Sequence, residues 1–130
     1  QVSKLANQII VGLTIGAVAE AITLCEKAGA DPNKMIKALT GGWADSKVLQ
    51  THGKRMIDKN FTPKGKTSVQ LKDMNNILEC ANSFSTELPI SNLVKDMYKI
   101  LVENGYGEMD HSSLYKEIER INNETIKSRQ

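Results

Sequence analysis

The chain has 130 residues, which is enough for one domain with a core of its own. Its 40% hydrophobic and 25% charged residues are typical of an ordinary globular protein. The net charge is only +2, the lysines are interleaved with acidic residues, and aromatic residues make up 5%, so the composition disfavours nucleic-acid and membrane partners.

The first predicted element is a long helix over residues 3–28. It is apolar on nearly all sides, as expected for a helix that other helices surround. Its most apolar part, residues 9–24, is too short for a membrane span and contains Glu20, so a central buried helix is the better interpretation. Gly12 and Gly16 form a G-x-x-x-G spacing that favours close packing in the core or between subunits.

Shorter helices follow, and no segment has the alternation of a strand. Asp31-Pro32 begins the second helix, which Gly41-Gly42 ends. The third starts near Asp45-Ser46, and Gly53 is a potential break in it. The other predicted elements are a loop over residues 60–66, a helix over 68–82, a helix from Pro89 to Gly105, and a last helix capped by Asp110. The total is about six helices.

Hydrophobic spacing predicts which faces of two of these helices are buried. In the fourth helix the predicted face consists of Leu71, Met74, Leu78 and Ala81. In the fifth it consists of Ile90, Leu93, Val94, Met97, Ile100 and Leu101.

Several chemically conspicuous residues have ordinary explanations. Cys25 and Cys80 lack the paired spacing of a zinc site, so we expect no metal and two buried free thiols in a reducing cytoplasm. His52 and His111 have no partner visible in the sequence, and we interpret His111 as a surface residue. Trp43, after two glycines, is interpreted as a packing anchor at a turn.

A polar cluster begins the otherwise apolar first helix. Lys4, Asn7 and Gln8 occupy positions i, i+3 and i+4, which lie on one face of a helix. An amine and two carboxamides could therefore reach the same small ligand.

Six motifs, in this order, carry a family resemblance: Lys4-Leu5-Ala6-Asn7-Gln8, Glu20-Ala21, Lys27-Ala28-Gly29, Asn60-Phe61, Lys72-Asp73 and Asp110-His111-Ser112. Together they resemble the C-terminal helical domain of the β-hydroxyacid dehydrogenases, which include 3-hydroxyisobutyrate dehydrogenase. The nearest group is the tartronate semialdehyde reductases, also called 2-hydroxy-3-oxopropionate reductases. The resemblance implies an all-α fold with about six helices around one long central helix, like the C-terminal domain of 6-phosphogluconate dehydrogenase.

The resemblance also implies a domain organisation. In the family, an N-terminal Rossmann domain binds NAD or NADP, and the helical domain closes over the nicotinamide and drives oligomerisation. This chain contains no G-x-G-x-x-G motif. We therefore expect residues 1–130 to be the C-terminal helical domain, with its own Rossmann domain absent from this chain and a homo-oligomer as the assembled form.

Each site residue receives its role from the resemblance. Lys4 corresponds to the catalytic lysine, which would act as general acid and base. Asn7, Gln8 and Asp73 would bind substrate, and Lys72 would contact the cofactor.

The expected reaction interconverts a short β-hydroxyacid and its semialdehyde, such as tartronate semialdehyde. Relatives commonly read Pro-Gly-Phe where this chain has Pro63-Lys64-Gly65-Lys66, with no aromatic residue. The pocket would therefore be wetter or more open, or basic enough to prefer a more acidic substrate. The alternative is a non-catalytic helical oligomerisation module. Under either reading, we expect the isolated chain to be inactive as a dehydrogenase.

Overall fold

The computed structural model describes the backbone of residues 1–129 and the side chains of residues 1–124. Over this range the chain is helical without a named strand, which confirms the predicted all-α fold. The elements are α1 (Val2–Lys27), α2 (Pro32–Leu39), α3 (Lys47–Asp58), α4 (Thr67–Ser83), α5 (Pro89–Leu101), the π-helical turn η1 (Val102–Tyr106), the 3-10 turn η2 (His111–Ser113) and α6 (Leu114–Arg129).

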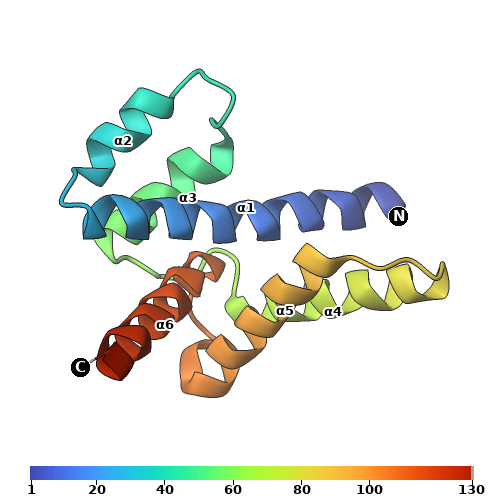
Figure 1. The fold of residues 1–130 in the computed structure, drawn as a ribbon. Coiled ribbons are helices and arrows are strands. Elements are labelled where there is room, and N and C mark those ends of the chain that lie inside the picture. Colours follow the sequence, from blue (N-terminus) through green and yellow to red (C-terminus); the bar gives the residue numbers. More distant parts are fainter. Residues whose placement is uncertain (130) are drawn as a thin grey trace.

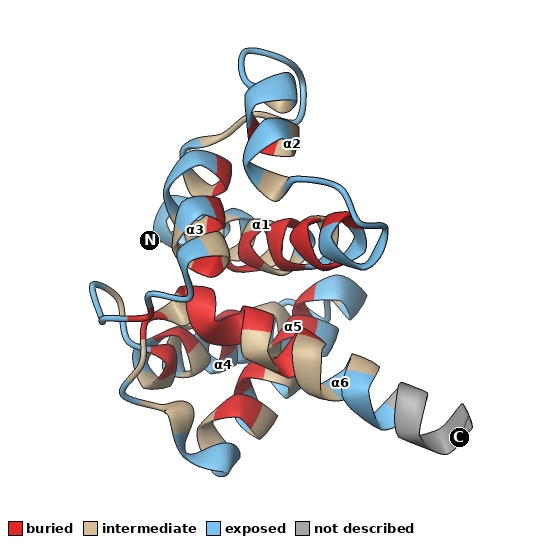
Figure 2. Cartoon of the chain, turned by 90° about the vertical axis from the view of Figure 1, so that its left-hand side faces the viewer, coloured by how far each residue is buried: buried red, intermediate tan, exposed pale blue. Residues whose placement is uncertain are grey.

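Helix α1 runs through the centre of the molecule (Figure 1). It contacts α2 and α3 on one side and α4, α5 and α6 on the other. Buried residues gather where these helices meet, with Ile15, Ala19 and Ile22 of α1 fully enclosed (Figure 2). By length and composition alone α1 could also cross a membrane, but its middle forms part of the shared core.

The small residues of α1 pack against helices of the same chain. A Cβ at Gly12 would lie 3.0 Å from Gln70 Nε2 and 3.1 Å from Met74 Sδ, both in α4. A Cβ at Gly16 would lie at ordinary contact distance from Leu114, 3.6 Å away. The predicted close packing is therefore present inside the core, and it is tightest between α1 and α4.

The helix starts follow local capping chemistry. The Asp31 side chain accepts a hydrogen bond from Asn33 N at 2.9 Å, and Ser46 Oγ accepts one from Leu49 N at 2.9 Å. The potential break at Gly53 was wrong, because α3 is continuous there. A Cβ on Gly53 would lie 3.0 Å from Ile36 Cδ1, so this glycine lets α2 pack closely on α3.

The predicted buried faces of α4 and α5 were only partly right. In α4 the buried residues are Thr67, Gln70, Met74 and Ile77, and in α5 they are Ser91, Val94, Tyr98 and Leu101. Ile90 and Leu93 are 63% and 61% exposed. Helix α4 packs against α1, α5 and η2, and α5 packs against α1, α4 and α6. Thr67 and Gln70 are buried on α4 where the segment over residues 109–113 supplies hydrogen-bond partners.

Two further expectations failed. Trp43 is fully exposed in the turn between α2 and α3, so it does not anchor any packing there. Cys25 is buried as a free thiol, whereas Cys80 is only half-buried. The expectation of two buried thiols holds for Cys25 alone.

Candidate functional site

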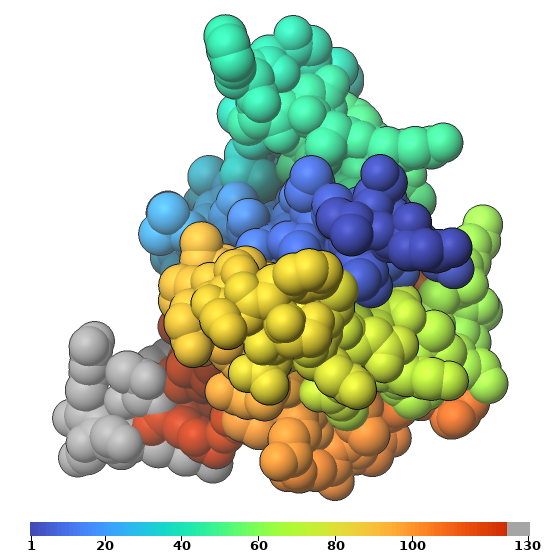
Figure 3. All heavy atoms as spheres, turned by 90° about the vertical axis from the view of Figure 1, so that its right-hand side faces the viewer, coloured from blue at the N-terminus to red at the C-terminus, as the bar shows by residue number. Residues whose placement is uncertain are grey.

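The structure joins three of the five predicted site residues through hydrogen bonds. Asn7 Nδ2 donates to Gln8 Oε1 at 3.1 Å, and Gln8 Nε2 donates to Asp73 Oδ2 at 2.7 Å. These bonds link the second turn of α1 to the middle of α4. Figure 3 shows the start of α1 at the surface, beside the α4–α5 region.

The two predicted lysines lie in the same region with free ammonium groups. Lys4 is exposed one helical turn before Gln8, and Lys72 is exposed on α4 next to Asp73. Within the described residues, neither lysine forms an ion pair or a side-chain hydrogen bond. The arrangement therefore offers an available amine beside an amide–carboxylate chain.

The carboxylate of Asp110 accepts more hydrogen bonds than its predicted role as a helix cap requires. This side chain is fully buried at the start of η2. Its Oδ1 accepts from Lys64 N at 3.0 Å and Gly65 N at 3.1 Å, and its Oδ2 accepts from Ser112 N at 3.0 Å and Ser112 Oγ at 2.5 Å. Burial favours the neutral acid, but these donors outweigh it and hold the pKa of Asp110 well below its ordinary value. Asp110 was predicted as a helix cap, and it also fixes the loop over residues 60–66.

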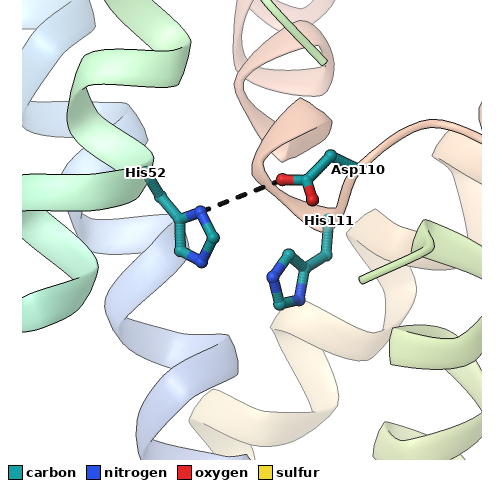
Figure 4. Close-up of side chains that lie close together, drawn as sticks. All are labelled: His52, Asp110 and His111. Atoms are coloured by element: carbon teal, nitrogen blue, oxygen red, sulfur yellow. Dashed lines mark ion pairs between the residues drawn. The ribbon is translucent and has the colours of Figure 1, made fainter. Parts of the chain in front are cut away.

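Both histidines belong to the surroundings of Asp110 (Figure 4). Their rings meet edge to face with centroids 4.7 Å apart, and His52 Nδ1 lies 3.8 Å from Asp110 Oδ2. His111 Nδ1 lies 2.9 Å from Gln70 Oε1. His111 is half-buried, so its interpretation as a surface residue was wrong. Burial is the main cause that lowers the pKa of each imidazole.

His52, Asp110 and His111 are residue types that bind metals, and their potential ligand atoms lie within 4.8 Å of one another. The surroundings do not suit a cation. Both oxygens of Asp110 already accept two hydrogen bonds each, and Arg55 Nε lies 3.3 Å from Oδ2. A metal ion would have to displace these donors and approach a guanidinium. We therefore describe this group as a structural ion-pair and hydrogen-bond network.

The long central helix α1, with its polar second turn and the other helices packed around it, forms an all-α domain. The family described as NAD-binding of NADP-dependent 3-hydroxyisobutyrate dehydrogenase matches residues 1–118. The chain belongs to this family.

Individual relatives agree with that assignment. The chain is 40% identical over 126 residues to 2-hydroxy-3-oxopropionate reductase of Escherichia coli, covering 97% of this chain and 43% of the relative. A 3-hydroxyisobutyrate dehydrogenase structure from Salmonella typhimurium superposes with a TM-score of 0.83 at 25% identity, covering 88% of this chain and 40% of that one. The Mycobacterium tuberculosis 3-hydroxyisobutyrate dehydrogenase shares the fold, with a TM-score of 0.82 at 20% identity over 91% of this chain and 43% of that one. The chain thus spans less than half the length of each of these relatives.

Proposed function

We propose that this chain is the helical part of an NAD(P)-dependent oxidoreductase that interconverts a short β-hydroxyacid and its semialdehyde. The observation that carries the proposal is the hydrogen-bonded chain from Asn7 through Gln8 to Asp73, beside the free amine of Lys4. Tartronate semialdehyde is the substrate we favour, because a relative with 40% identity is named 2-hydroxy-3-oxopropionate reductase.

Lys4 supplies the proton in this proposal. Reduction of a carbonyl group leaves negative charge on its oxygen, which must be neutralised as it forms. The Lys4 ammonium gives its proton to that oxygen, and in the reverse direction the neutral amine removes the proton from the hydroxyl group. Its exposed position on the first turn of α1 leaves it accessible to a substrate.

Asn7, Gln8 and Asp73 orient the substrate. Asn7 donates one amide hydrogen to Gln8 and retains a second donor and its own carbonyl oxygen for a ligand. Asp73 fixes the Gln8 side chain, which makes the position of the Asn7 amide more definite. A rigid pair of amides suits the hydroxyl and carboxylate oxygens of a short hydroxyacid.

The cofactor, NAD or NADP, provides the hydride. We propose that a separate Rossmann domain of the longer polypeptide binds most of it, and that Lys72 contacts it from this domain. The observation that supports a contact between Lys72 and the cofactor is that the Lys72 ammonium is exposed and unpaired within the described residues. It can therefore approach a polar or anionic group. A cytoplasmic location and a homo-oligomeric enzyme complete the proposal.

A non-catalytic oligomerisation module is the second candidate. The observation that favours it is the apolar surface that the described residues leave uncovered, including Ile10 and Leu24 of α1 and Ile90 and Leu93 of α5. This reading requires that the longer protein neither binds a dinucleotide nor reduces a semialdehyde.

The deciding experiment assays the longer protein with NADH or NADPH and tartronate semialdehyde. Lys4→Ala is expected to lower kcat by about 10²- to 10⁴-fold, the range for removal of a general acid. Lys34→Ala, an exposed lysine on α2, is the matched control and should retain wild-type turnover. Retention of most of kcat by Lys4→Ala would remove Lys4 from its role. The 130-residue chain alone should associate and show no turnover.

A further inference from the structure

Gln70 is an amide buried in the core between α1 and α4. Gln70 is only 3% exposed. Its Oε1 lies 2.9 Å from His111 Nδ1, while its Nε2 has no hydrogen-bond partner and lies against Gly12. A buried amide with an unpaired donor carries a free-energy cost that an apolar side chain of similar size would avoid. Packing alone therefore does not explain this residue.

The position of Gln70 relates it directly to the candidate site. Gln70 precedes Asp73 by three residues on α4, and Gly12 follows Gln8 by four residues on α1. Each separation is about one helical turn, so the Gln70–Gly12 contact lies one turn below the Gln8–Asp73 hydrogen bond. Because Gly12 has no side chain, Gln70 and Met74 of α4 approach α1 closely at this level, and Gln70 is the one of the two that a side-chain contact with His111 holds.

We propose that Gln70 is a positioning residue, which His111 holds in place and which thereby presents Asp73 to Gln8. The assignment of the Gln8–Asp73 pair to substrate binding rests on the proposed function. The coupling of the Gln70–Gly12 contact to the Gln8–Asp73 hydrogen bond does not. With Gln70 Oε1 as the acceptor, neutral His111 carries its proton on Nδ1 and donates it to the amide oxygen.

The surroundings of His111 hold its ring in place. The His52 ring from α3 packs against it, and a Cβ on Gly65 would lie 3.2 Å from His111 Cε1. The backbone oxygen of His111 accepts a hydrogen bond from Tyr98 Oη at 3.0 Å. His111 is therefore held in one position, and its hydrogen bond holds the Gln70 side chain in turn.

Charged groups reach this ring from three elements. Asp110, the residue before η2, and Asp73 of α4 favour its protonation, whereas Arg55 and a protonated His52 from α3 oppose it. Protonation of His111 would keep the donor on Nδ1, so the contact with Gln70 should persist as pH falls through the imidazole titration.

The test is two-dimensional NMR of the 130-residue chain at pH 7.5, following the side-chain amide signals of Gln8. Gln70→Met keeps the length of the side chain but removes the acceptor. We expect the Gln8 signals to move toward those of an exposed glutamine, with amide hydrogen exchange at least about threefold faster because the Gln8–Asp73 bond weakens. Gln70→Glu restores an acceptor, so the Gln8 signals should return to wild-type positions while the pKa of His111 rises.

Asn76→Met is the matched control, because Asn76 is an exposed amide on α4 outside the site. It should leave the Gln8 signals unchanged. If Gln70→Met does not fold, His111→Phe removes the same hydrogen bond from the other side and should shift Gln8 in the same way. Wild-type Gln8 signals in the folded Gln70→Met or His111→Phe chain would overturn the proposal, as would Gln70→Glu shifting them as far as Gln70→Met. The readout needs no turnover, so its failure is distinct from failure of the proposed enzyme activity.

Discussion

Asp110 and Gln8 both bind partners from a distant part of the chain, but in different surroundings. Asp110 is fully enclosed, and its two oxygens accept four hydrogen bonds from three residues. Gln8 is half-buried, and within the part of the chain that the structure describes its side chain bonds Asn7 and Asp73 alone. Asn7 and the nearby Lys4 remain exposed. A saturated buried carboxylate stabilises the fold, whereas partly satisfied polar groups at the surface remain available for a ligand. The two regions should therefore respond very differently to substitution.

The largest expected loss of stability comes from Asp110→Asn. The new amide keeps the shape of the carboxyl group but removes the charge that Arg55 faces and places donors against backbone N–H groups. Breaking a buried ion pair by removing one partner typically costs about 3–5 kcal/mol in the free energy of unfolding. Urea denaturation measures it. Asp58→Asn, which breaks the exposed pair with Lys54, is the control and should cost less than about 1 kcal/mol.

The pH dependence of stability reports on the histidines beside Asp110. The folded-state pKa of both His52 and His111 is lowered, mainly by burial, so the unfolded chain binds more protons than the folded one. Their contribution is complete above the unfolded pKa of about 6.5 and is lost as pH falls below it. The contribution of Asp110 is lost only below its unfolded pKa of about 3.9, so urea midpoints between pH 7 and pH 5 isolate the histidines.

His52→Gln removes one of the two titrating groups. The fall in stability between pH 7 and pH 5 should become shallower than in the unsubstituted chain. An unchanged slope would mean that His52 does not titrate in this window.

Substitutions at Gly12 and Gly16 test how tightly α1 packs against the neighbouring helices. Gly12→Ala places a methyl group 3.0 Å from Gln70 Nε2 and 3.1 Å from Met74 Sδ, so one of the side chains or helices must move. Overpacking of this kind costs about 1–3 kcal/mol. Gly16→Ala meets Leu114 at 3.6 Å, and replacing a helical glycine there should be neutral or stabilising by up to about 1 kcal/mol. Thermal unfolding of the two variants measures the difference, and equal effects would argue against a tight α1–α4 contact.

Local signals in the sequence were enough to predict the helices. Asp31 and Ser46 are caps whose chemistry acts within three residues, and Pro89 starts α5 as predicted. Contacts between distant segments were harder to predict. Nothing local distinguishes Gln70 from a surface glutamine, because its burial depends on Gly12 and His111. Nor does the hydrophobic pattern of α5 show that Ile90 and Leu93 face outward, because it does not specify which side the other helices cover.

For the candidate site, the sequence pattern predicted which residues of one helix lie together but not which distant residues join them. The spacing of Lys4, Asn7 and Gln8 placed them together because a helix fixes that geometry. Asp73 was assigned to the same site only from the family resemblance, because it lies 65 positions from Gln8 in the sequence and no local pattern relates the two. Of the network around Asp110, only the helix cap was predicted. Its bonds to Lys64 and Gly65 gave no signal, because their donors are backbone N–H groups, which every residue but proline carries.

The smallest stability effect is expected at Asp73, the half-buried carboxylate of the candidate site. Asp73→Asn retains an oxygen that can accept from Gln8, so the free energy of unfolding should change by less than about 1 kcal/mol. If Asp73 orients the substrate-binding amides, kcat/KM of the longer enzyme should nevertheless fall by about tenfold, which corresponds to roughly 1.4 kcal/mol of lost transition-state binding. Glu79→Gln, an exposed acid on the same helix, should change neither quantity. A loss of stability at Asp73 as large as that at Asp110 would mean that the Gln8–Asp73 bond supports the fold in the same way, and the contrast between the two regions would then disappear.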